Sequence, residues 1–207
     1  MYDVFTFTAD GVTVQLEALA WTNDTTRATA LVRQNGVWVK TGALDRRFVG
    51  CYRTTTVSGQ CEDSENKRFL WNTDNRVLRA VKLVVGAGSW TYSSGAKRQW
   101  NAAAGNMIQF INGLIEESIL VTCSLDMTIA AGVYYVGLAL NATNVFHDLG
   151  CIAGISVNGT TLTCVLNQLL SPGYSYVAGV ERGDAVNTAT LNAGSNVVKG
   201  IVGQLNC

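Results

Sequence analysis

The sequence predicts an all-β protein: an antiparallel β-sandwich of jelly-roll type, preceded by a region rich in β-hairpins. The first observation is composition, because the chain has 21 glycines and a single proline, with Thr, Asn, Val and Ala frequent and Lys and Glu scarce. This mixture favours strands and turns, since β-branched side chains pack well on a pleated surface. The second observation is that apolar side chains alternate in many short runs separated by turn residues, which is typical of an antiparallel sandwich or barrel.

Residues 1–82 are predicted to form the hairpin-rich region. Its clearest element spans 31–39, where two short apolar segments flank Asn35-Gly36. Both central residues of a type I′ turn need a positive φ, which Asn and Gly adopt most readily. A second hairpin is expected around Asp10-Gly11. The further strands expected in this region lie at 4–8, 12–19, 47–57 and, as two strands, within 66–86.

Residues 83–207 are predicted to form the sandwich. A hairpin is expected at 151–165 around Asn158-Gly159, and Pro172-Gly173 suit the two central positions of a type II turn. A short helical turn is expected at 112–118. Strands are expected near 89–93, 98–101, 106–111, 118–125, 132–140, 150–157, 160–167, 173–181 and 185–191.

Size and charge indicate a protein whose surface is partly covered by partners. A chain of 207 residues can bury about 70% of its surface, enough for a full core. Charged residues make up only 14%, below the usual level of about a quarter. Such a surface predicts a homo-oligomer, and we expect a trimer. No apolar run reaches the length of about 18 residues needed to span a membrane, so no membrane partner is expected.

The net charge is zero, but residues 27–82 hold eleven bases against five acids. Nucleic-acid binding is not expected, because acids are interleaved with these bases and few aromatic residues accompany them. Ion pairs within the subunit or between subunits are the favoured interpretation. The candidates for pairing with an acidic partner are Arg46, Arg47, Arg53, Arg68 and Arg76.

The sequence offers no convincing catalytic set. His147 is the only histidine, and its neighbour Asp148 points away from it on an extended chain, so a Ser-His-Asp arrangement is not predicted. No CxxC pair is present, and a metal site built on one histidine is not expected. Acid pairs such as Glu62-Asp63 are typical of solvated loops, whereas a glycosidase needs two carboxyl groups across a cleft. We therefore expect no enzyme activity, no cofactor and no metal.

Aromatic residues in the second half allow two interpretations. Exposed rings of Trp90, Trp100 and Tyr174 would form a platform for a glycan or a protein receptor. Alternating pairs such as Trp90 and Tyr92 place both rings on one sheet face, however, and such a face is more often core or subunit interface.

The six cysteines also allow two interpretations. Cys151 and Cys164 would lie diagonally across the 151–165 hairpin, at a Cα separation of about 7–8 Å that is slightly long for a disulfide. Cys207 ends the sequence and would bridge to a neighbouring subunit if exposed. The alternative is that all six are buried or inert thiols, as is usual in a reducing cytosol.

The sequence resembles a family of tailed-phage and prophage virion proteins, usually described as tail-fibre or structural proteins. The resemblance covers nearly the whole chain and is densest over 21–79. The segments that carry it are 21–28 (WTNDTTRA), 34–42 (QNGVWVKTG), 46–50 (RRFVG), 53–56 (RTTT), 62–64 (EDS), 67–72 (KRFLWN), 89–92 (SWTY), 98–101 (RQWN) and 172–174 (PGY).

The resemblance implies a non-enzymatic structural protein on the virion surface, assembled in the host cytoplasm, with the major capsid or tail protein as partner. Relatives commonly carry a segment before the Tyr2-Asp3-Val4-Phe5 start, where only Met1 stands here. We therefore expect a capsid decoration (cement) protein or a fibre component, with a receptor- or glycan-binding module of a tail fibre as the alternative.

Overall fold

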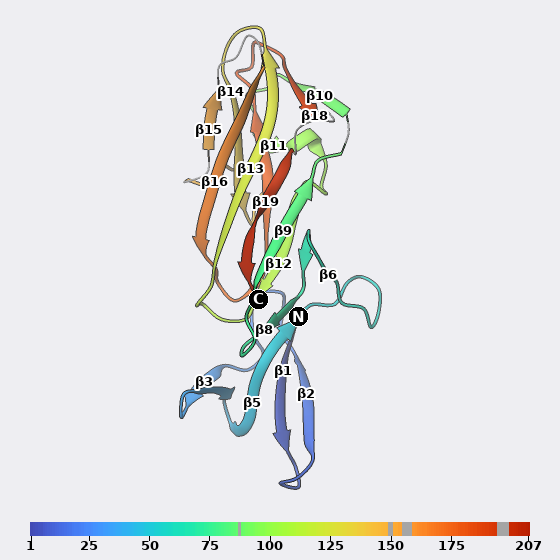
Figure 1. Cartoon of the computed structure of the whole chain (residues 1–207), viewed down its shortest axis with the longest axis vertical. Helices are drawn as coiled ribbons and strands as arrows, with labels where there is room; N and C mark the ends of the chain where they lie inside the picture. The colour runs from blue at the N-terminus through green and yellow to red at the C-terminus, as the bar shows by residue number, and fades with distance from the viewer. Residues whose placement is uncertain (87, 149–150, 155–158, 194–198) are drawn as a thin grey trace.

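The computed structural model describes residues 1–86, 88–148, 151–154, 159–193 and 199–207. Figure 1 shows an elongated molecule made of strands, with a large sandwich at one end, a smaller N-terminal sheet at the other, and both termini near the middle. The all-β class, the antiparallel sandwich and the hairpin-rich N-terminal region are confirmed. Among the described residues, no helix is long and apolar enough to cross a membrane.

The N-terminal sheet has the strand order β2-β1-β5-β4-β3, with β8 paired to β5. The hairpin at Asn35-Gly36 is confirmed, because both residues have positive φ (51° and 83°) and join paired strands. The strands are β1 (Tyr2–Thr8), β2 (Val14–Ala20), β3 (Leu31–Gln34), β4 (Val37–Lys40), β5 (Ala43–Tyr52) and β8 (Leu70–Asn72).

The sandwich contains two sheets, which we call sheet I and sheet II. The strands of sheet I are β9 (Leu78–Val84), β10 (Gly88–Tyr92), β13 (Ser118–Ile129), β16 (Thr160–Leu169), β18 (Ala189–Ala193) and β19 (Gly200–Asn206). The strands of sheet II are β6 (Asp63–Ser64), β7 (Lys67–Arg68), β11 (Arg98–Gln99), β12 (Met107–Asn112), β14 (Tyr134–Leu140), β15 (Cys151–Gly154) and β17 (Gly173–Arg182). A 3-10 turn, Trp100–Ala102, follows β11.

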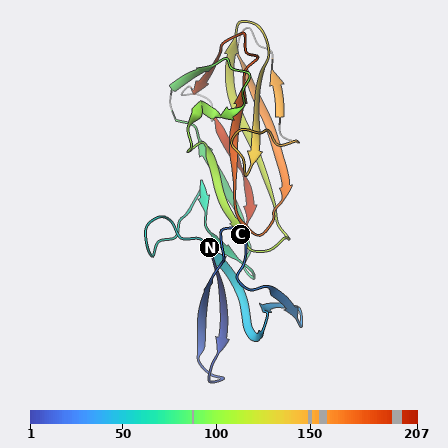
Figure 2. The same cartoon turned by 180° about the vertical axis from the view of Figure 1, so that it is seen from behind.

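The connectivity is that of a jelly roll. Eight strands, β9, β12, β13, β14, β15, β16, β17 and β19, can be counted first to eighth along the chain. Sheet I then has the order first-eighth-third-sixth (β9-β19-β13-β16), and sheet II has the order second-seventh-fourth-fifth (β12-β17-β14-β15). Two four-stranded sheets interleaved in this way define the jelly-roll form of the sandwich, so this prediction also holds. Figure 2 shows the two layers from behind.

One local prediction fails because the jelly roll passes the chain between its sheets. The 151–165 segment is not a hairpin, since β15 pairs with β14 in sheet II and β16 pairs with β13 in sheet I. Its predicted turn, which includes Asn158, lies outside the described residues. The two strands predicted within 66–86 are present as β8 and β9, and they belong to different sheets, the N-terminal sheet and sheet I. The boundary expected at 82/83 lies inside β9, which is a strand of sheet I.

One apolar core runs through the molecule. Side chains on β13 alternate between buried and exposed along its length, as one covered sheet face requires. The largest buried side chains between the sheets include Ile108, Phe110, Leu125, Met127, Tyr134 and Leu138. The core continues into the N-terminal sheet through Phe5, Phe48 and Trp71, so the two regions share one interior.

The joint between the N-terminal sheet and the sandwich is polar as well as apolar. Arg27 pairs with the buried Asp3 at 2.9 Å and donates to the carbonyl of Gly113 in the sandwich. Its guanidinium also lies 4.5 Å from the centre of the Trp21 ring. Trp71 packs so closely on Gly113 that a Cβ there would overlap its ring. An ion pair, a hydrogen bond and close aromatic packing thus join the two regions.

Candidate functional site

An uncovered apolar face is the most distinctive surface of the N-terminal sheet. Strand register places these side chains on one face: Tyr2, Val4, Val14, Leu16, Ala18, Ala20, Tyr52 and Leu70. We call this set the open face. Val14, Leu16 and Leu70 are 69%, 72% and 48% exposed. Tyr2 and Tyr52 stack at 5.0 Å between ring centres and make a rigid aromatic plate beside the aliphatic side chains.

None of the eight residues of the open face is charged, but the register places Thr6 and, opposite it, Arg47 on the same side of the sheet. Arg47, opposite Thr6 at its margin, pairs with Asp74 at 3.0 Å. The other side of the sheet is covered, since Phe5 and Cys51 lie there in the core. Strand β2 is also an edge of the sheet, so its outer backbone groups are available to another strand. A largely apolar sheet face beside an unpaired edge is typical of a surface that another protein covers.

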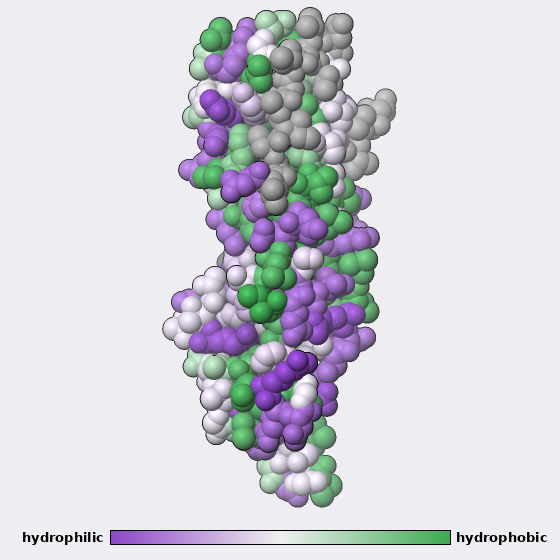
Figure 3. Space-filling model, turned by 90° about the vertical axis from the view of Figure 1, so that its left-hand side faces the viewer, coloured by the Kyte–Doolittle hydropathy of each residue, from purple (hydrophilic) through white to green (hydrophobic). Residues whose placement is uncertain are grey.

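The outer face of sheet I is a second charge-poor surface. Register aligns Lys82, Val202, Thr122 and Val165 in one row across four strands. Val165 and Val202 are each about half exposed. On the side of the molecule seen in Figure 3, hydrophobic residues reach the surface at several heights between hydrophilic ones.

All five arginines predicted to meet an acidic partner already have acidic partners within the chain. Arg46 pairs with Glu17 and Asp45, Arg47 with Asp74, Arg53 with Asp24, Arg68 with Asp63, and Arg76 with Glu116 and Glu117. The intrachain alternative therefore describes them best. Their pairing with another protein stays a prediction, and it suits Arg47 most, because half of its side chain is exposed.

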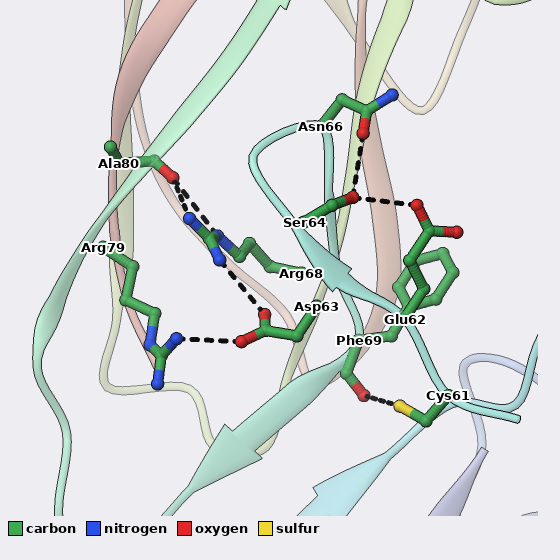
Figure 4. Close-up of polar contacts among 9 residues, drawn as sticks. All are labelled: Cys61, Glu62, Asp63, Ser64, Asn66, Arg68, Phe69, Arg79 and Ala80. Atoms are coloured by element: carbon green, nitrogen blue, oxygen red, sulfur yellow. Dashed lines mark hydrogen bonds and ion pairs between the residues drawn. The ribbon is translucent and has the colours of Figure 1, made fainter.

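One of these clusters shows how the basic stretch is used (Figure 4). Asp63 lies between Arg68, at 3.4 Å, and Arg79, at 2.8 Å. Arg68 also donates two hydrogen bonds to the carbonyl of Ala80. Asp63 and Arg68 belong to sheet II, whereas Arg79 and Ala80 belong to β9 of sheet I. The cluster therefore connects the two sheets by ion pairs and hydrogen bonds at one side of the sandwich.

The predicted aromatic platform is wrong for two of its three rings. Trp90 is 8% exposed and Trp100 is fully buried. Their indole nitrogens donate inward, to the Glu181 carboxylate at 2.8 Å and to the Val180 carbonyl at 3.0 Å. The face that carries Trp90 is therefore the interior of the sandwich, in line with the alternative interpretation that such a face belongs to the core.

Tyr174 is the only ring of the three that is partly exposed. It lies 4.2 Å from the Arg53 guanidinium and packs edge-on against Phe69. Its hydroxyl donates to Gln109 at 2.8 Å. Arg53 also pairs with Asp24 at 2.9 Å, so these contacts link Tyr174 of β17 to the N-terminal region.

The predicted cysteine pairings are corrected as well. Cys164 faces Cys123, its direct partner on the neighbouring strand β13, rather than a residue of the 151–165 segment. Cys151 lies in β15, which pairs with β14 in the opposite sheet. Cys207 is buried, because its backbone exchanges two hydrogen bonds with Val77 and so folds the chain end onto the joint. A bridge from Cys207 to a neighbouring subunit is therefore not supported.

Glu181 is the centre of a buried polar network that sequence reasoning missed. Its carboxylate is fully buried between the sheets. One oxygen accepts from Trp90 and Tyr134, at 2.8 and 2.7 Å, and the other accepts from Arg98 and the Asn101 amide, at 2.7 and 3.0 Å. All of its acceptor capacity is used, so it has none left for a substrate proton. Burial and the neighbouring carboxylate raise the pKa of the Tyr134 phenol.

Among the described residues no group of three or more His, Cys, Asp or Glu side chains could hold a metal ion. His147 lies in the loop after β14, where its amide donates to the Leu138 carbonyl. The strongest chemical features of the described chain are thus structural networks and uncovered faces.

No known protein-family model matches the chain, and no curated protein matches it either.

Proposed function

We propose that this chain is a non-enzymatic structural protein of a bacteriophage particle surface, a capsid decoration (cement) protein or fibre component, that stabilises the particle by self-association. The observation that carries the proposal is the open face: a largely apolar sheet surface next to an unpaired edge strand. The jelly roll supports it by analogy of fold, because viral capsid domains use this architecture. The resemblance over residues 21–79 points to the same class of protein.

A sister copy is the partner that fits the open face best. The eight residues of the open face bring no like charges to a contact between copies, and Arg47 beside them is already paired with Asp74 at 3.0 Å. Stacked tyrosines are favourable at interfaces because they supply large rigid contact area. A stable interface buries about 800 Å² on each partner. The eight residues of the open face are too few to supply that area alone, so the contact must also include residues around them. We expect a homotrimer in which each open face meets a different surface of the neighbouring copy, because contact of two open faces with each other would close a two-fold dimer.

The experiment is a measurement of mass in solution by sedimentation equilibrium over a range of protein concentrations. The wild type is expected to be an oligomer, and Leu16→Lys is expected to weaken association at least about tenfold, because it places a charge in an apolar contact. Val186→Lys is the matched control, since Val186 is 82% exposed but lies far from the open face, between β17 and β18. A monomeric wild type at about 100 μM, where even weak interfaces associate, would refute self-association.

The particle location needs its own test. Antibody labelling of phage particles that encode this chain is expected to decorate the capsid or a fibre in electron micrographs. Particles without any label would contradict the virion assignment while leaving the oligomer measurement intact.

The alternative proposal, a receptor- or glycan-binding module, keeps one supporting observation: Tyr174 and Tyr176 lie together, with ring centres 6.2 Å apart, on the outer side of sheet II. Lectin domains also use the jelly roll. Glycan binding by purified protein that is lost in Tyr176→Ala would favour this alternative over the structural role.

A further inference from the structure

Two cysteines from distant parts of the sequence meet inside the sandwich. Cys123 and Cys164 are 41 residues apart, yet they are directly opposite each other on β13 and β16. Directly opposite residues on antiparallel strands point to the same face of the sheet. Here that face is the interior, since the two residues are 0% and 3% exposed.

The geometry points to a cross-strand disulfide site formed by Cys123 and Cys164, which goes beyond the proposed function and does not depend on it. Opposite residues in an antiparallel pair have Cα atoms about 4.5–5.5 Å apart, which lies within the range of about 4.4–6.8 Å that disulfides span. The two sulfur atoms lie 2.8 Å apart, so both side chains already point at each other. A bond between them needs no movement of either strand.

The surroundings distinguish this pair from the other described cysteines. Their inner-face neighbours are aliphatic: Val121 and Leu125 on β13, and Leu162 and Leu166 on β16. The contact with the Cys123 sulfur and, after it, burial raise the pKa of the Cys164 thiol, so this thiol is slow to react while the fold is closed. Since β16 is an edge strand of sheet I, local opening of that edge is the natural route by which an oxidant reaches the sulfurs.

The chemistry is thiol–disulfide exchange with a small disulfide oxidant such as oxidised glutathione. One thiol loses its proton and attacks the oxidant, which forms a mixed disulfide and releases one molecule of reduced glutathione. The second thiol, also deprotonated, displaces the other glutathione and closes the Cys123–Cys164 bond. The two cysteines are oxidised by two electrons, and one oxidised glutathione becomes two reduced molecules that take up both protons.

The bond would tie the edge strand β16 to the long strand β13 of sheet I. A cross-link between residues so far apart in sequence restricts the unfolded chain strongly. The oxidised protein is therefore expected to have a Tm higher than that of the reduced protein by about 4–16 °C. A particle protein with this bond would gain stability on leaving the reducing cytosol.

The test uses the full-length protein, refolded in oxidised or in reduced glutathione. Chymotryptic peptides are then analysed by mass spectrometry, because no Lys or Arg lies between Arg98 and Arg182 and trypsin would leave Cys123, Cys151 and Cys164 in one peptide. The expected product links the Cys123 and Cys164 peptides and is lighter than their sum by two hydrogen atoms. No such product, or a link from Cys164 to another cysteine, would overturn the proposal.

Thermal melting supplies the second readout. Wild type is expected to melt higher after oxidation than after reduction, whereas Cys164→Ala is expected to melt at the same temperature in both. Cys51→Ala, at another buried cysteine in the N-terminal sheet, is the matched control and should keep the full oxidation-dependent shift. A wild type that forms the link without a rise in Tm would refute the stabilising role. The cross-linked peptide and the difference in Tm between oxidised and reduced protein are both measured on the wild type, so a variant that fails to fold does not weaken the test.

Discussion

Replacement of Glu181 by Gln is the most direct test of how the sandwich is held together. The carboxylate is fully buried and accepts four hydrogen bonds, from Trp90 in sheet I and from Tyr134, Arg98 and Asn101 on the side of sheet II. Gln has almost the same shape, but one of its two terminal atoms is an amide nitrogen that donates. Whichever way the amide is turned, two of the four donors lose their acceptor and face another donor.

The magnitude follows from that count. A buried donor left without an acceptor costs about 1–3 kcal/mol, and breaking a buried ion pair costs about 3–5 kcal/mol. The Arg98 side chain is 30% exposed, so water can take over part of its lost pairing. We therefore expect Glu181→Gln to lower the free energy of unfolding by about 3–5 kcal/mol. For a chain of this length that corresponds to a fall in Tm of about 6–20 °C.

The assay is urea unfolding followed by tryptophan fluorescence, with the m-value checked to be unchanged. Glu62→Gln is the control, because the Glu62–Lys67 pair, at 2.9 Å, has side chains that are 32% and 34% exposed. A pair that exposed contributes about 0–1 kcal/mol. If Glu181→Gln cost no more than Glu62→Gln, the view of Glu181 as the polar centre of the sandwich would be refuted.

Three further predictions follow from the packing and the titrating groups. Gly113→Ala should destabilise the protein by at least about 1–3 kcal/mol, because the added Cβ overlaps the Trp71 ring. Gly105→Ala is the control and should change the stability little, because a Cβ there meets open space. Equal urea midpoints for the Gly113→Ala and Gly105→Ala variants would contradict the close packing of Gly113 against Trp71. Burial raises the pKa values of the Tyr134 phenol and the Cys51 thiol, so above about pH 8.5 the unfolded chain releases protons that the folded protein retains. Stability should therefore fall as pH rises through 9 and 10, and a flat urea midpoint over that range would be the contrary result. At the acid end, the Arg53 hydrogen bond lowers the pKa of Asp24, so the stability it contributes is present above about pH 4 and is lost as pH falls below. Asp24→Asn should remove that part of the acid dependence in denaturation curves measured at pH 3–6.

The role of the basic stretch shows where sequence reasoning reached its limit. The excess of bases over 27–82 was visible, and so was the possibility that the acids interleaved with them are their partners. The partners that the fold supplies come partly from elsewhere, as in the pairing of Arg76 with Glu116 and Glu117 across the joint. A charge count within one segment carries no information on such pairs, since only the fold brings these segments together.

The same limit explains the cysteines. Spacing suggested Cys151 with Cys164, because a tight Asn158-Gly159 turn would have paired their strands. In the jelly roll the chain changes sheets at this point, so β16 pairs with β13 and Cys164 meets Cys123. The signal that could have found this pair was the jelly-roll order itself, which makes the third and sixth strands neighbours.

The sequence by itself determined the features that depend on near neighbours along the chain: the all-β class, the alternation along strands such as β13, and the turn at Asn35-Gly36, where backbone sterics select those two residues. Tertiary structure alone decided which strands share a sheet, which faces are interior, and which charges and sulfurs meet. Trp90 faces Glu181 and Cys123 faces Cys164 because strands far apart in sequence pack against each other. The open face follows from the same cause: the sandwich closes over its own apolar side chains, whereas the N-terminal sheet has a second layer on one side only.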